Sequence, residues 1–161
     1  MEDLRELSIQ VGHALKERGL LLATAESCTG GGAAQAVTDI AGSSEWFDCG
    51  FITYSVASKT EMLGVPDALL AQHGAVSEEI AEAMAIGALA NSNAHVSLST
   101  TGIAGPGGAV PGKPVGTVCF GWAKGDYTHT ERHVFAGDRQ AVRHQTVVLA
   151  LKGLLRLIEQ V

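Results

Sequence analysis

Hydrophobic positions near the start of the chain recur at helical spacing and then give way to a short continuous apolar run. The spaced positions are Leu4, Leu7, Val11 and Leu15, with charged and polar residues between them. Spacing of three to four residues is typical of an amphipathic helix, and Gly19 is a common helix stop. We therefore predict a helix over residues 3–18 and a buried strand over residues 20–25.

The two patterns alternate along the remaining chain. Further helices are predicted over residues 33–39, 58–63, 67–72 and 78–91, and in a last segment that Asp138 caps and that runs to about Ile158. Strands are predicted over residues 47–53, 95–101, 115–122 and 127–135, the last two joined as a hairpin at Lys124–Asp126. This order predicts a single α/β domain over residues 1–161, a three-layer α/β/α sandwich with a mixed, mostly parallel sheet.

Composition narrows the classes of protein. Charged residues are only 17% against 46% hydrophobic, so the chain can bury a core and is not disordered. The net charge of −6 and the lack of a basic tract argue against nucleic acid as a partner. No apolar run is long enough to span a membrane, and the first residues lack a signal-peptide segment. Three widely spaced cysteines suggest a reducing compartment, so we expect a cytoplasmic protein.

The densest candidate chemistry lies in the turn between the first predicted strand and the second predicted helix. It contains Ser27, Cys28 and Thr29, followed by Gly30, Gly31 and a third glycine. A strand-to-helix turn aims backbone N–H groups at its occupant, and glycines let that occupant approach the backbone. The turn therefore suits a nucleophile beside an oxyanion hole or an anion cradle. A simple helix cap is the alternative.

Two other polar or glycine-rich segments also follow predicted strands. They are Tyr54–Ser55 and Thr100–Gly108. Ligands of open α/β sheets gather at the carboxyl ends of strands, so these segments and the Ser27 turn are expected to converge on one pocket. Lys59 follows closely and, if desolvated, is a base for serine; a solvated helix lysine is the alternative. None of the six histidines lies in a context that marks it as a partner of Ser27.

Cofactor and metal motifs are missing from the sequence. The glycines fit neither a dinucleotide fingerprint nor a phosphate-binding loop with its lysine, so we predict no cofactor. His129-x-Glu131-x-His133 places its three side chains on one strand face, which we interpret as structural, and no metal site is predicted. Arg139 and Arg143 share a helix face and suit a phosphate, or else form a solvent-facing pair.

Five segments, in order along the chain, together resemble the nicotinamide-nucleotide amidase family, the family of the CinA C-terminal domain. They are Ala25–Gly31, Phe51–Ser55, Gly74–Ser77, Thr101–Pro106 and Gly137–Arg139. Thr101 stands where the family often has serine, and it retains the hydroxyl. The molybdopterin-binding-like domain of full CinA proteins is missing from this sequence, so we expect the stand-alone form.

The resemblance implies hydrolysis of the carboxamide of nicotinamide mononucleotide (NMN) to nicotinate mononucleotide and ammonia, in pyridine nucleotide recycling. It further implies that Ser27 is the nucleophile and Lys59 its base, with Tyr54 and Thr101 around the reacting group. It also implies a tendency to form homo-oligomers.

Substrate binding is expected at the turn and at two further places. The residues are Cys28, Thr29, Gly30, Gly31, Gly102, Arg139 and Arg143. Amide hydrolysis needs oxyanion donors, which the turn can supply, and a cationic arginine suits the substrate phosphate.

Two alternatives remain open at this point. Cys28 is a rival nucleophile, because helix N-termini favour thiolates. The other alternative is a non-catalytic nucleotide-binding or interaction module of the competence/damage-inducible CinA type.

Overall fold

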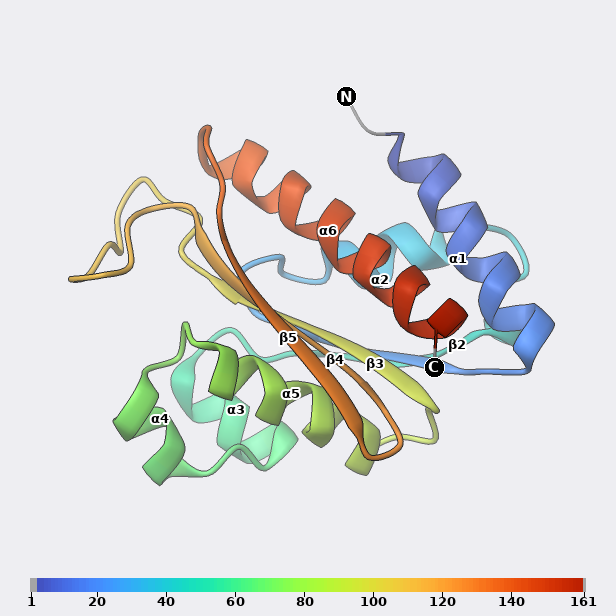
Figure 1. The fold of residues 1–161 in the computed structure, drawn as a ribbon, viewed down its shortest axis with the longest axis horizontal. Coiled ribbons are helices and arrows are strands. Elements are labelled where there is room, and N and C mark those ends of the chain that lie inside the picture. Colours follow the sequence, from blue (N-terminus) through green and yellow to red (C-terminus); the bar gives the residue numbers. More distant parts are fainter. Residues whose placement is uncertain (1–2, 161) are drawn as a thin grey trace.

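A five-stranded sheet forms the middle layer of the computed structural model, which describes residues 3–160 (Figure 1). Its strands are β1 (Leu22–Glu26), β2 (Phe47–Ile52), β3 (Val96–Gly102), β4 (Thr117–Lys124) and β5 (Tyr127–Val134). They lie in the order β2-β1-β3-β4-β5, and only β4 runs against the others. The predicted mixed, mostly parallel sheet is confirmed.

Helices cover both faces of the sheet (Figure 1). One layer contains α1 (Leu4–Arg18), α2 (Gly32–Thr38) and α6 (Arg139–Gln160), and the other contains α3 (Val56–Leu63), α4 (Asp67–His73) and α5 (Glu78–Ala90). A short 3-10 helix, η1 (Ser43–Glu45), lies between α2 and β2 and was not predicted. No helix within residues 3–160 is long and apolar enough to cross a membrane.

Each face of the sheet has its own hydrophobic core, because side chains alternate along a strand. Leu22 and Leu98 belong to the core beneath α1, α2 and α6. Ala23 and Ala25 of β1 belong to the core beneath α3, α4 and α5, where small side chains allow the helices to approach.

The predicted elements are confirmed, with ends displaced by a few residues. Asp138 caps α6 as predicted, since its carboxylate accepts a hydrogen bond from the Ala141 N–H. The first strand begins at Leu22 instead of residue 20, because the Leu20 N–H still bonds to Leu15 O in the left-handed turn that ends α1. The fourth strand likewise starts late, at Thr117, whose N–H donates to Pro114 O in a turn.

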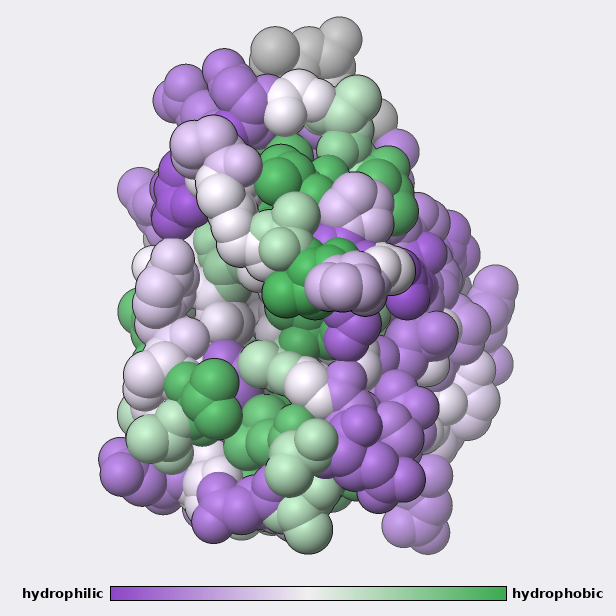
Figure 2. Space-filling model, turned by 90° about the vertical axis from the view of Figure 1, so that its left-hand side faces the viewer, coloured by the Kyte–Doolittle hydropathy of each residue, from purple (hydrophilic) through white to green (hydrophobic). Residues whose placement is uncertain are grey.

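The carboxyl ends of β1, β2, β3 and β5 lie at the same end of the sheet, which we call its carboxyl end. The segments after them are joined there, because Ser27 N donates to Thr100 O and Thr53 N donates to Glu26 O. Figure 2 faces this side of the molecule and shows hydrophobic side chains gathered near its middle, with hydrophilic ones around them. Ile52, the last residue of β2, is an exposed hydrophobic residue, and so are Tyr54 and Val56, which come shortly after it.

Candidate active site

The side chains of Ser27 and Lys59 are hydrogen-bonded to each other at the carboxyl end of the sheet. Ser27 follows β1, and Lys59 lies on α3, whose first turn is capped by the Ser55 hydroxyl. The Lys59 Nζ atom donates to Ser27 Oγ at 3.1 Å and to the main-chain oxygen of Thr53 at 2.6 Å. Ser27 is 7% exposed and Lys59 is 1% exposed. The pair is therefore buried, and the alternative of a solvated Lys59 is wrong.

The surroundings of Lys59 favour its neutral form. Burial lowers the pKa of the Lys59 amine from its usual 10.5, and only a Cys28 thiolate would act in the opposite direction. No carboxylate within residues 3–160 forms an ion pair with this amine. A buried amine without a counter-ion holds its proton less strongly, and a neutral amine can accept one from a neighbouring hydroxyl.

Backbone N–H groups of the Ser27 turn are left without acceptors. The N–H groups of Cys28, Thr29 and Gly31 donate to no oxygen within the described part of the chain. Gly30 and Gly31 have φ values of 60° and 100°, a left-handed conformation that side chains rarely adopt. These glycines turn the chain sharply ahead of α2, and the turn keeps donors for an anion or for a developing oxyanion.

Glu26 is a buried residue beneath the Ser27 turn whose role the sequence reasoning missed. Its side chain is fully buried, and one carboxylate oxygen accepts from Ala33 N at 2.8 Å and from the Thr29 hydroxyl at 2.6 Å. The other oxygen accepts from Ala34 N at 3.0 Å. The Gly31 cap of α2 has no side chain, so Glu26 supplies the missing acceptor and charge. An acidic residue ending a buried strand just before a helix without a side-chain cap was the available signal.

The side chains of Cys28 and Thr29 point into the protein. Cys28 packs in the core beneath α6, and burial together with the Glu26 carboxylate raises its pKa to about 12. The Thr29 hydroxyl bonds both to Glu26 and to the Thr100 hydroxyl. Both residues therefore offer a ligand their main chain, and Cys28 stays a thiol near neutral pH.

The other predicted residues near the reacting group differ in how close they come to Ser27. The main-chain oxygen of Tyr54 accepts from Ser27 Oγ at 3.5 Å, but the Tyr54 side chain is 61% exposed. The Thr101 hydroxyl is buried and donates to Ala75 O at 2.8 Å, so it does not contact Ser27. Gly102 ends β3, and a Cβ atom there would lie 2.7 Å from the Val118 side chain. The catalytic roles predicted for Tyr54 and Thr101 stay predictions.

The two arginines of α6 lie over the site but make different contacts. Arg139, which is exposed, donates to Gly105 O at 2.8 Å and to the Tyr54 hydroxyl at 3.1 Å. Arg143 donates to Cys28 O at 3.1 Å and to the Thr29 carbonyl oxygen at 3.2 Å. Arg143 therefore fixes the main chain of the Ser27 turn through its carbonyl oxygens. Arg139 instead connects the segment that follows β2 with the segment that follows β3.

The three side chains of the His-x-Glu-x-His pattern do lie together on β5. The Glu131 carboxylate contacts His129 and His133 at 2.8 Å each, and Arg156 at 3.3 Å. Burial works to raise the pKa of Glu131, but the hydrogen bonds with His133 and His129 lower it overall. Among residues 3–160, no group of three or more His, Cys, Asp and Glu side chains is placed to hold a metal ion.

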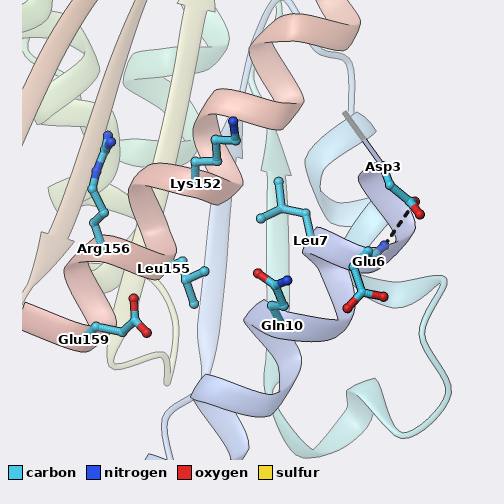
Figure 3. A pocket seen from close by; sticks show the side chains of 8 residues that line it. All are labelled: Asp3, Glu6, Leu7, Gln10, Lys152, Leu155, Arg156 and Glu159. Carbon is cyan, nitrogen blue, oxygen red and sulfur yellow. Dashed lines mark hydrogen bonds between the residues drawn. The ribbon is translucent and has the colours of Figure 1, made fainter. Parts of the chain in front are cut away.

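A separate pocket of about 380 Å³ lies between α1 and α6 (Figure 3). Its lining residues are Asp3, Glu6, Leu7, Gln10, Lys152, Leu155, Arg156 and Glu159. This lining mixes acidic and basic side chains and includes none of the predicted site residues, so the pocket has no part in the Ser27 site.

Comparisons with known proteins agree with this architecture. A family model described as the CinA C-terminal domain matches residues 4–158. Nicotinamide-nucleotide amidohydrolase PncC of Pseudomonas putida is 50% identical and covers 98% of each chain. The protein of the same name from Escherichia coli (strain K12) is 54% identical over 94% of this chain and 93% of its own. The crystal structure of a CinA superfamily protein from Klebsiella pneumoniae matches with a TM-score of 0.96 at 38% identity, covering 99% of this chain and 100% of that one.

Proposed function

The chain belongs to the CinA C-terminal domain family, and from that membership we propose that it is a nicotinamide-nucleotide amidohydrolase. It hydrolyses the carboxamide of NMN to nicotinate mononucleotide and ammonia, in NAD recycling. The relatives of that name match nearly from end to end at about half identity. The observation that carries the chemistry is the buried Lys59 amine 3.1 Å from the Ser27 hydroxyl.

In the first half of the reaction, Ser27 attacks the carboxamide carbon. The neutral Lys59 amine takes the hydroxyl proton while Ser27 Oγ forms the new C–O bond. The Thr53 carbonyl holds one Lys59 N–H, which leaves the nitrogen lone pair for Ser27. When the tetrahedral intermediate collapses, the C–N bond breaks and the Lys59 ammonium gives its proton to the departing nitrogen. Ammonia leaves, and the nicotinoyl group stays as an ester on Ser27.

The second half reverses these proton transfers with water. Lys59 accepts a proton from the attacking water, and the resulting tetrahedral intermediate expels Ser27 Oγ, which takes the proton back from Lys59. In both halves the negative oxygen needs donors, and the unpaired N–H groups of Cys28, Thr29 and Gly31 are the candidates. Removing one oxyanion donor typically costs an enzyme about 3 kcal/mol of barrier stabilisation. The turn therefore contributes to the rate as strongly as a side chain.

Arg139 is the better candidate of the two arginines for the substrate phosphate. It is exposed, and its remaining N–H groups are not committed to the protein, whereas Arg143 is engaged with two carbonyl oxygens of the turn. The exposed Tyr54 ring lies beside Arg139, so the two can contact the same ligand. Arg143 then acts as a positioning residue for the Ser27 turn.

The proposed setting of the enzyme is the cytoplasm, as a homo-oligomer in which residues 1–161 form one domain and no cofactor is needed. All three cysteines are free, which suits a reducing compartment.

The test is ammonia release from NMN by the purified protein and by Ser27→Ala. We expect turnover by the parent, with nicotinate mononucleotide as the second product, and loss of at least about a thousandfold in Ser27→Ala. Ser44→Ala, which alters an exposed serine of η1, is the matched control and should keep the parent rate. A folded Ser27→Ala protein with the activity of the control would refute the mechanism. A parent that releases no ammonia from NMN would refute the activity.

A further inference from the structure

The edge of the sheet formed by β5 is open. β5 pairs with β4 through all of its eight residues without a shift in register. No other strand within residues 3–160 pairs with its outer side. Figure 1 shows β5 as the front strand of the sheet, with no helix or loop crossing before it. The opposite edge, β2, has six residues, and its register with β1 is irregular between Leu22 and Ala23.

The unpaired backbone groups of β5 form a regular row. Phe135 N donates to Gly116 O on the β4 side, so every second residue before it also faces β4. The N–H and C=O groups of Thr128, Thr130, Arg132 and Val134 therefore point outward. Their N–H groups have no acceptor in the described part of the chain. Such a row is a template for another strand, which natural proteins usually interrupt with a proline, a bulge or a cover.

The side chains of β5 favour a second copy of the same strand. On the face towards α6, Glu131 lies between His129 and His133, and on the other face Arg132 lies among threonines. An antiparallel copy related by a two-fold axis at Thr130 places His129 opposite Glu131 of the second copy, and Thr128 opposite its Arg132. An axis at Glu131 would oppose two glutamates, and an axis at Arg132 would oppose two arginines, which destabilises a pair of strands.

We propose that β5 pairs antiparallel with β5 of a second copy of this chain, about a two-fold axis at Thr130, so that the two sheets become continuous. Edge strands that pair in this way satisfy the outward N–H and C=O groups of both copies. In the sheet, β3 and β4 separate β5 from β1, which leads to Ser27. Pairing at β5 therefore leaves each Ser27 site intact, and the proposal is independent of the proposed reaction.

A disulfide tests both the surface and its register. In the proposed pair, Thr130 lies opposite Thr130 of the second copy, with Cα atoms about 5.5 Å apart, a separation that a disulfide spans. Thr128 is the matched control, because the two threonines have equivalent surroundings. The Thr130 hydroxyl donates to Glu78 of α5 at 2.8 Å, and the Thr128 hydroxyl donates to Glu82 of the same helix at 2.8 Å. Two copies of Thr128 would be offset by four residues, about 13 Å along the strand.

We expect Thr130→Cys to form a disulfide-linked dimer under mild oxidation on a non-reducing gel. Thr128→Cys and the parent, which carries the three native cysteines, should stay unlinked. Thr130→Cys that remains unlinked, or Thr128→Cys that links equally, would overturn the proposed pairing.

A proline at the same position tests the surface without chemistry on cysteine. Thr130→Pro removes an N–H that points away from β4, so the β4–β5 ladder keeps its hydrogen bonds. By sedimentation, the parent should be a dimer and Thr130→Pro should dissociate at least about tenfold more readily, with circular dichroism like that of the parent. A parent that is monomeric at every concentration, or a Thr130→Pro dimer as tight as the parent's, would contradict the assignment.

Discussion

The substitution Glu26→Gln removes one charge from the buried support of the Ser27 turn and changes almost no volume. The glutamine oxygen can keep the hydrogen bonds from Ala33 N and the Thr29 hydroxyl, but its NH₂ group then faces the Ala34 N–H, donor against donor. A hydrogen bond to a charged group contributes about 1.5–3 kcal/mol, and a negative charge at a partly buried helix N-terminus up to about 2 kcal/mol. Relief from burying a charge offsets part of this loss. We expect the free energy of unfolding to fall by about 2–3 kcal/mol.

The assay for Glu26→Gln combines thermal unfolding with steady-state kinetics on NMN. For a chain of this length the loss corresponds to a fall in Tm of about 4–12 °C. Because Glu26 holds Thr29 and the start of α2, kcat should fall about 10- to 100-fold with a smaller change in KM. Glu45→Gln is the control, since that side chain is 57% exposed and forms a surface ion pair with Lys16, so the Tm of this variant should hardly move. A Glu26→Gln protein with the Tm and kcat of the parent would refute the support role.

Three further predictions follow from the contacts of the site. Cys28→Ala should keep kcat within about threefold, because a thiol whose pKa is raised to about 12 is not the nucleophile; abolished turnover in a folded protein would reverse this. Arg139→Ala should raise KM for NMN about tenfold or more with little change in kcat. Arg143→Lys should instead lower kcat. A lowered kcat in Arg139→Ala together with a raised KM in Arg143→Lys would exchange the roles of the two arginines. The parent's kcat/KM should rise with pH through the lowered pKa of Lys59, because only the neutral amine is a base. Between that lowered pKa and 10.5 the unfolded chain binds more protons than the folded one, so the free energy of unfolding also rises with pH. Lys59→Met should abolish the rise in kcat/KM and the rise in stability, and it should stabilise the protein near pH 7. A rise of either quantity that persists in Lys59→Met would contradict the assignment.

The order of the elements was predictable because the local signals agree with the tertiary structure. Asp138 and Ser77 cap their helices as their positions predict, and Gly125 makes the hairpin between β4 and β5. Strand starts were less predictable, because residues such as Leu20 are as apolar as the strand yet still belong to the end of α1. η1 was missed since its three residues carry no periodic pattern.

The candidate site was predictable in its position and less so in its detail. Three polar segments that follow parallel strands predicted a site at the carboxyl end of the sheet, and Ser27 and Lys59 are in contact there. Spacing alone did not reveal that Lys59 is buried, because that depends on how α3 packs against α5 and against the segments that follow β1 and β2. Nor did helix periodicity separate Arg139 from Arg143: both share a face, but one turn of α6 brings Arg143 to the back of the Ser27 turn. Glu26 was overlooked because its partners come from the helix after the turn.

The central claim is that Ser27 carries the covalent intermediate while Lys59 moves the proton. Rapid acid quenching of the enzyme with NMN, followed by peptide mass analysis, tests this most directly. We predict the mass of the acyl group on Ser27, with Cys28 unmodified, and much slower appearance of that ester in Lys59→Met, because the Lys59 amine activates Ser27 for its formation. An acyl group on Cys28, or turnover that never labels Ser27 under any quench condition, would contradict the account.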